Sequence, residues 1–76
     1  MKDWKERIHE ELEDACSYAK LSEEAEKDGH RDQATFLWLI GRDEATHARY
    51  LISIYDGELS PECKEKWDKV RDMYHV

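Results

Sequence analysis

The chain carries two long stretches in which apolar residues recur every three or four positions, the spacing of one face of an α-helix. Asp3, followed three residues later by Glu6, has the pattern of an N-terminal helix cap. Gly29 suits the left-handed position just after a helix end. We therefore predict a first helix over about residues 4–28, with one face made of Ile8, Glu11, Leu12, Ala15, Tyr18, Ala19, Ser22 and Ala25.

The second stretch predicts a helix over about residues 31–56, with Gly57 as its C-terminal stop. Two polar residues, Glu44 and His47, interrupt an inner face that otherwise consists of Leu37, Ile40, Gly41, Ala48, Leu51 and Tyr55. Because the turn near Gly29 is short, the two helices are expected to form an antiparallel hairpin.

A third, shorter helix is predicted over about residues 61–74. Ser60 fits its N-cap, and Pro61 fits the first turn, where a missing N–H costs nothing. One side of this helix is lined by Cys63, Trp67, Val70 and Tyr74. The pattern contains no strand alternation and no long linker. The expected fold is thus all-α and a single domain, with a long two-helix hairpin and a short C-terminal helix.

The segment 36–40 is apolar on every side of the second helix. A helix of that kind has to be covered on more than one side, and one neighbouring helix cannot do so. We therefore expect Phe36 and Trp38 to pack in an interface, with two hairpins dimerising into a ferritin-like four-helix bundle or joining a larger homo-oligomer.

Charge narrows the classes of partner. The chain has 19 acidic and 12 basic side chains and a net charge of −7. Nucleic acids and anionic membranes, which need a basic face, are poor partners for it. No apolar run approaches the roughly 20 residues of a membrane span, and the N-terminus lacks the apolar core of a signal peptide. Cys16 and Cys63 form no Cys-x-x-Cys pair, which favours free, inert thiols in a reducing cytoplasm; Cys63 is a candidate for cross-linking subunits in air.

The candidate chemistry lies in the second helix. Glu44 and His47 are three residues apart, so both side chains lie on one face. Glu11 lies 18 residues before Gly29, His47 lies 18 after it and Glu44 lies 15 after it. The hairpin therefore brings all three to one level. A second pair with the same spacing, Glu6 and His9, belongs to neither apolar face.

Three such residues are half of a known pattern. A four-helix bundle can hold two metal ions with a Glu from each of two helices and a Glu-x-x-His from each of the other two. A two-fold dimer of this chain would supply that set. Carboxylate and imidazole ligands suit iron or manganese, and zinc also binds such sites. The alternative is that Glu11, Glu44 and His47 are a chance polar stripe or a buried Glu–His hydrogen bond. Asp14 either adds a carboxylate beside them or is solvated.

Glu11, the Tyr18 that follows seven residues later, the turn 25–29 and the segment 43–48 together resemble one half of a rubrerythrin or ferritin-like diiron domain, over residues 8–52. The resemblance implies two iron ions per dimer and oxidation of Fe(II) with O₂ or peroxide. It implies a bridging role for Glu44, a terminal or chelating role for Glu11 and a terminal nitrogen from His47. It also implies that Tyr18, otherwise a core residue, hydrogen-bonds a ligand carboxylate.

Single-hairpin members of this superfamily include the encapsulated ferritins, whose diiron site forms between two subunits. Two features of this chain differ from the proteins that it resembles. No rubredoxin-like cysteine module follows the hairpin, and the tail 72–76 does not resemble an encapsulin-targeting peptide, which argues against residence in an encapsulin shell. The alternatives to an oxidase are a non-catalytic helical interaction module and a subunit of an iron-storage assembly.

Overall fold

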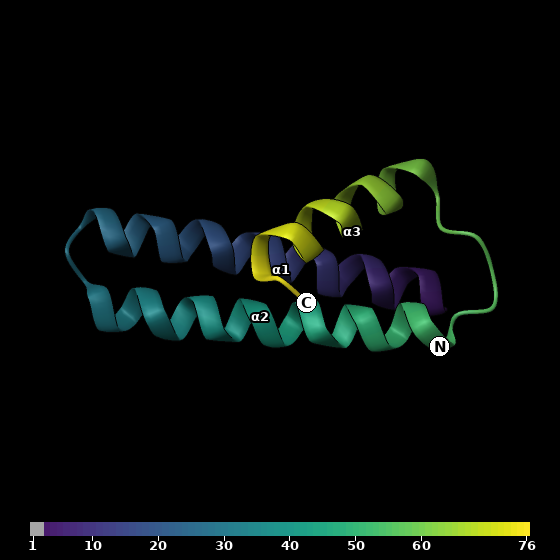
Figure 1. The fold of residues 1–76 in the computed structure, drawn as a ribbon, viewed down its shortest axis with the longest axis horizontal. Coiled ribbons are helices and arrows are strands. Elements are labelled where there is room, and N and C mark those ends of the chain that lie inside the picture. Colours follow the sequence, from purple (N-terminus) through teal and green to yellow (C-terminus); the bar gives the residue numbers. More distant parts are fainter. Residues whose placement is uncertain (1–2) are drawn as a thin grey trace.

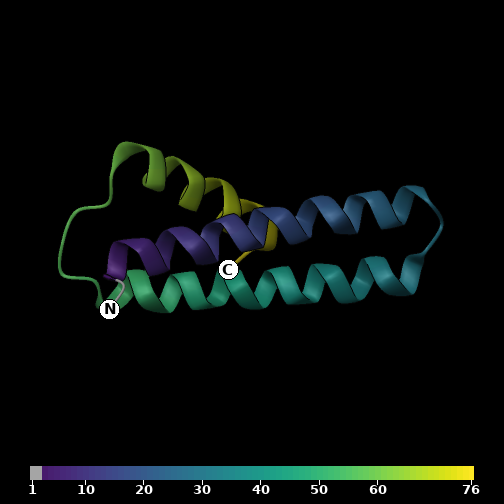
Figure 2. The same cartoon turned by 180° about the vertical axis from the view of Figure 1, so that it is seen from behind.

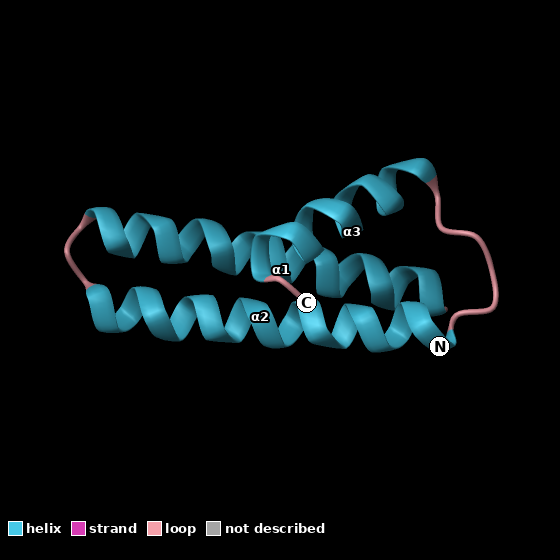
Figure 3. Ribbon diagram, viewed as in Figure 1, coloured by secondary structure: helices cyan, strands magenta, loops and turns pink. Residues whose placement is uncertain are grey.

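The computed structural model describes residues 3–76, and three helices make up this part of the chain: α1 (Trp4–Lys27), α2 (Arg31–Ile54) and α3 (Pro61–Tyr74). The two long helices run antiparallel side by side, and α3 returns obliquely across one side of them (Figure 1; Figure 3). The predicted all-α fold and its hairpin are confirmed. None of these helices is long and apolar enough to cross a membrane.

The helix ends follow the local signals in the sequence. The Asp3 side chain accepts a hydrogen bond of 2.9 Å from the Glu6 N–H, and the Ser60 hydroxyl accepts one of 3.1 Å from the Cys63 N–H. Both contacts satisfy N–H groups that a helix start leaves free. Gly29 has a φ of +79°, the left-handed backbone that glycine adopts without strain.

The predicted stop at Gly57 is wrong. Helix α2 ends at Ile54, and its C-cap Tyr55 has an extended backbone, with φ −76° and ψ 121°. Gly57 is not in the left-handed region. It instead leaves room for an aromatic ring, because a Cβ added there would lie 2.7 Å from the ring of Tyr55. Gly57 is thus needed for the packing of Tyr55 in the loop after α2, and it does not cap the helix.

The core lies where the three helices meet, and the residues that α2 buries there are all small. Its fully buried members include Ile8, Leu12 and Ala15 of α1, Ala45 and Ala48 of α2, and Val70 and Tyr74 of α3. The larger apolar residues predicted for the inner face of α2 are less covered, and Ile40 is 43% exposed. Small side chains on the inner face let the helices approach closely, and the larger ones turn to an outer face. Ala45, which the predicted inner face did not include, is among these small buried residues.

Tyr74 anchors α3 to the hairpin. Its hydroxyl donates a 2.7 Å hydrogen bond to the Ala15 carbonyl, and its ring lies 5.3 Å from that of Trp38. A Cβ on Gly41 would lie 2.1 Å from the Tyr74 oxygen, so glycine is needed for this contact. Tyr74 of the same chain thus covers part of Trp38, which is half-buried. Packing of Trp38 against a second subunit stays a prediction. Phe36 remains 64% exposed.

The side of the hairpin away from α3 is uncovered (Figure 2). Along it, two rows of residues follow the alternating three- and four-residue spacing of a coiled-coil seam. We call these two rows the open face: Trp4, Arg7, Glu11, Asp14, Tyr18 and Leu21 on α1, and Leu37, Ile40, Glu44, His47, Leu51 and Ile54 on α2. None of them is fully buried, and Trp4 and Ile54 are 53% and 65% exposed. Half of this face is apolar and in contact with solvent.

A Gly41→Ala substitution tests the α3 contact. In a helix, alanine is normally favoured over glycine by about 1 kcal/mol. Here the added methyl group overlaps the Tyr74 hydroxyl, so we expect a net loss of about 1–3 kcal/mol in the free energy of unfolding, as for other overpacked sites. Denaturant unfolding measures this, with the exposed Asp43→Ala as a control on the same helix. A more stable Gly41→Ala chain would show that α3 does not pack as described.

Candidate metal centre

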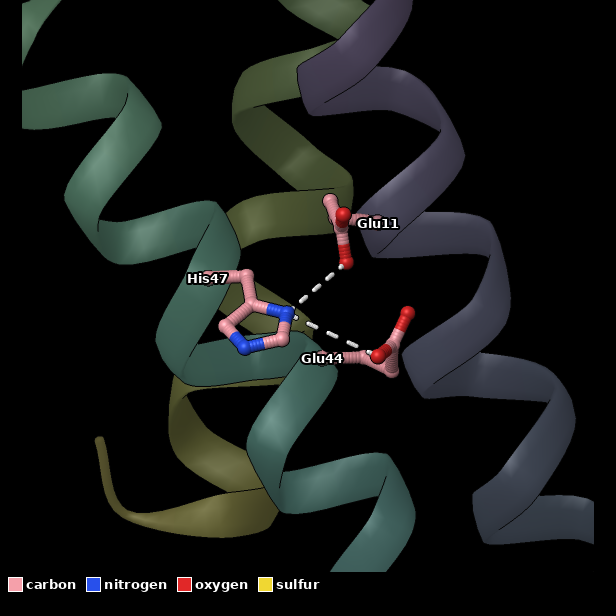
Figure 4. A group of neighbouring side chains, drawn as sticks. All are labelled: Glu11, Glu44 and His47. Atoms are coloured by element: carbon pink, nitrogen blue, oxygen red, sulfur yellow. Dashed lines mark ion pairs between the residues drawn. The ribbon is translucent and has the colours of Figure 1, made fainter.

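Glu11, Glu44 and His47 come together near the middle of the open face (Figure 4). His47 Nδ1 lies 3.5 Å from Glu11 Oε2 and 3.6 Å from Glu44 Oε1. One ligand atom from each residue lies within 4.8 Å of the other two. The two carboxylates are largely covered, at 15% and 22% exposed, whereas the His47 side chain is 54% exposed.

Local helix geometry explains why these residues meet. Glu44 and His47 lie on adjacent turns of α2, and Glu11 faces them from α1 at the same number of residues from the turn. In Figure 4 α3 lies behind the two long helices, and the three side chains lie on the near side. The structure therefore brings together the residues predicted from the sequence, and their role as metal ligands stays a prediction.

His47 makes no hydrogen bond to either carboxylate. The distances of 3.5 and 3.6 Å exceed the roughly 3.2 Å limit of an N–H···O hydrogen bond. Glu11 Oε2 is buried and has no hydrogen-bond partner among residues 3–76. A buried oxygen without a partner costs free energy. The simple alternative of a buried Glu–His hydrogen bond therefore does not describe this geometry.

Negative charge accumulates at the centre. Burial raises the pKa of Glu44 above its usual value, and the neighbouring Glu11 carboxyl raises it further. Asp14, which is exposed, also has a raised pKa, from partial desolvation and from the nearby Glu44. Asp14 is thus close enough to Glu44 to interact with it. A cation between these groups would offset the repulsion.

The spacing suits an ion. Two ligand atoms at about 2.1 Å from a metal, and roughly 90–120° apart, are separated by about 3.0–3.6 Å. The two distances from the imidazole nitrogen fall in or at the edge of this range. The widest separation, up to 4.8 Å, needs a small side-chain rotation to close. Three ligands leave further coordination positions open on one side.

No family model, no curated protein and no solved structure matches the chain.

Tyr18, predicted to hydrogen-bond a ligand carboxylate, does not do so within one chain. It is half-buried on α1, and its Cβ lies 2.9 Å from the position that a Cβ on Gly41 would occupy. Its hydroxyl makes no hydrogen bond among the residues that the structure describes. Packing against α2 is the contact that the structure shows for it.

The second Glu-x-x-His pair lies outside the candidate centre. His9 is 60% exposed and lies 3.5 Å from Glu13, whose carboxylate also pairs with Lys66 of α3. This side of α1 therefore holds α3 in place. The two cysteines are free, and burial raises the pKa of the Cys63 thiol, which makes it less reactive near neutral pH.

The raised pKa of Glu44 predicts a pH dependence of stability for the metal-free chain. The folded chain binds this proton more tightly than the unfolded chain, so its contribution favours folding below the ordinary value of 4.5 and is lost as pH rises through the folded pKa. Glu44→Gln removes the effect. We expect the metal-free variant to be more stable than the parent at pH 7, and the difference to shrink toward pH 4.

Chemical unfolding in the presence of chelator, at several pH values, measures this difference. Glu24→Gln, an exposed carboxyl of α1 outside the centre, is the matched control. A Glu44→Gln chain that is less stable than the parent at pH 7 would contradict the repulsion described here.

Proposed function

We propose that two copies of this chain join through their open faces and complete a two-metal centre that oxidises Fe(II) with O₂ or peroxide. The observation that carries this proposal is Glu11 Oε2, which is buried and has no hydrogen-bond partner among residues 3–76. It lies beside Glu44 and His47, in the middle of an exposed apolar face. A metal ion would give that oxygen a partner. A second copy would cover the apolar residues around it.

The need for a second copy follows from both the ligands and the surface. One chain supplies two carboxylates and one imidazole, whereas a two-metal centre in a helical bundle uses four carboxylates and two imidazoles. His47 is half exposed, as expected of a ligand whose other side awaits a partner. Large apolar residues that reach solvent at regular helical spacing are typical of an interface. A two-fold pairing duplicates the half-site.

In this proposal each residue has one task. Glu44 would bridge the two ions, as the resemblance implies, and Glu11 and His47 would each hold one ion from opposite helices. The partly buried carboxylates attract metal ions of charge +2 and +3. Together with the imidazole they favour metals that prefer oxygen and nitrogen ligands. Two Fe(II) ions at one centre can give up two electrons together. With O₂ and two protons this yields two Fe(III) and H₂O₂; with H₂O₂ and two protons it yields two Fe(III) and two water molecules.

Manganese or zinc would occupy the same donor set, because these ligands do not select sharply among first-row metals. Iron is proposed because the resemblance to ferritin-like half-domains implies two iron ions on this set of carboxylate and imidazole ligands. A non-catalytic module of the same fold would bind zinc, or little metal, and would not consume oxygen.

Metal content tests the centre. We expect about one ion per chain, or about two per dimer, in protein loaded with Fe(II) under anaerobic conditions. Glu44→Ala should lose most of this metal, because it removes one of the two carboxylates that each chain supplies. The matched control is Glu6→Ala, which alters the other Glu-x-x-His pair and should retain the parent content. Equal metal in the parent and the Glu44→Ala chain would contradict the proposed ligands.

The reaction has its own test. After anaerobic Fe(II) loading, admission of O₂ or peroxide should convert the bound iron to Fe(III) faster than the same iron in buffer. A ferrous chelator and near-ultraviolet absorbance follow the conversion. His47→Ala should slow it at least tenfold, whereas His9→Ala should not. If bound Fe(II) oxidises no faster than free Fe(II), the oxidase is rejected and the non-catalytic module is the remaining function.

A further inference from the structure

The residues of the open face lie at matching levels on the two helices. Counted from Gly29, its residues form six pairs that each take one residue from α1 and one from α2 at matching distance from the turn. From the far end toward the turn, these pairs are Trp4–Ile54, Arg7–Leu51, Glu11–His47, Asp14–Glu44, Tyr18–Ile40 and Leu21–Leu37. The two polar pairs are the middle ones. Their midpoint is the centre of the face, with two largely apolar pairs on either side.

Two pairings of identical faces are compatible with this order. If the two-fold axis runs across the hairpin through that midpoint, α1 meets the partner's α1 and α2 meets the partner's α2, both antiparallel. Ile40 then faces the partner's Leu51, and Glu44 faces the partner's His47. If the axis runs along the hairpin, α1 meets the partner's α2, and the two residues of each pair face each other across the interface. Glu44 then faces the partner's Asp14.

Arg7 distinguishes the two pairings. It is the one basic residue among the twelve of the open face, it is exposed, and its side chain forms no ion pair among residues 3–76. With the axis along the hairpin, Arg7 would be placed against the partner's Leu51, and a charge covered by an aliphatic side chain is costly. With the axis across the hairpin, Arg7 faces the partner's Tyr18, and the partner's Asp14 lies about one turn, or roughly 6 Å, along the helix.

We infer that the second copy packs with the axis across the hairpin, and that Arg7 docks on Tyr18 and Asp14 of the partner subunit to fix this register. The inference rests on the proposed dimer and extends it to named contacts. An aromatic ring accepts a guanidinium by a cation–π contact, and a carboxylate accepts it by hydrogen bonds. Tyr18 thereby gains a role that no contact within one chain provides.

The same register adds Asp14 to the metal centre from across the interface, because it faces the partner's Glu11. The dimer centre then holds six carboxylates and two guanidiniums, a net charge of −4 with the histidines neutral. Two divalent ions balance that charge. Arg7 is a positioning residue in this account, since it orients the partner and touches no metal.

Cross-linking tests the register. Ile40→Cys and Leu51→Cys are placed in separate chains in which Cys16 and Cys63 are replaced by serine, and the two chains are mixed and oxidised. We expect a mixed disulfide between them, and little between two Ile40→Cys chains, whose residues lie roughly 16 Å apart along the helices. Mixing Ile40→Cys with Tyr18→Cys probes the other pairing. A cross-link there, without one between positions 40 and 51, overturns the inference.

A double-mutant cycle tests the Arg7 contact. Arg7→Met should weaken dimerisation about 3- to 10-fold in sedimentation experiments, for two such ion pairs per dimer. In an Asp14→Asn background the same change should cost clearly less, because the acidic partner is already gone. Lys5→Met, an exposed lysine of α1 outside the open face, controls for the loss of a positive charge. An equal effect in both backgrounds overturns the contact.

Both experiments are run with chelator and with saturating Mn²⁺, so their outcomes are separate from those of the proposed function. The 40–51 cross-link without metal binding rejects the oxidase and keeps the register. Metal binding with the 40–18 cross-link rejects the register and keeps the centre. A monomer under both conditions rejects both.

Discussion

One constraint shapes this small protein: two largely covered carboxylates and a half-exposed imidazole lie in the middle of an apolar surface. One of the carboxylate oxygens is buried and has no hydrogen-bond partner in the part of the chain that the structure describes. A chain of 76 residues can bury only a modest core and usually relies on a metal, a disulfide or a partner chain. With two free cysteines, the chain has no disulfide to compensate. Metal binding and pairing of the open faces would supply what its own core lacks.

The two sides of the hairpin divide these tasks. On one side, Gly41 and Ala45 let α3 approach closely, and the Tyr74 hydroxyl ties it to the backbone of α1. With that side occupied, the opposite side is the one left for a second chain. The centre and the apolar residues both lie there, so association and metal binding would stabilise each other.

Much of this fold was predictable from the sequence, because local signals were strong and agreed with one another. Asp3, Ser60 and Gly29 marked helix ends, and counting from the turn brought Glu11 level with His47. The end of α2 was not predictable, since Gly57 accommodates the Tyr55 ring in a loop that only the folded chain reveals. The contact between Trp38 and Tyr74 was not predictable, because nothing local indicates that α3 folds back over α2. Asp14 was ambiguous, because its proximity to Glu44 depends on the packing of two helices.

A crystal structure of the iron-loaded protein, with anomalous scattering measured at the iron edge, would show directly whether two copies share one two-metal centre. We expect two iron peaks at an interface between two hairpins, close to a two-fold axis, with Glu11, Glu44 and His47 as their ligands. Iron bound elsewhere, or a hairpin whose open face meets no second copy, would contradict this expectation.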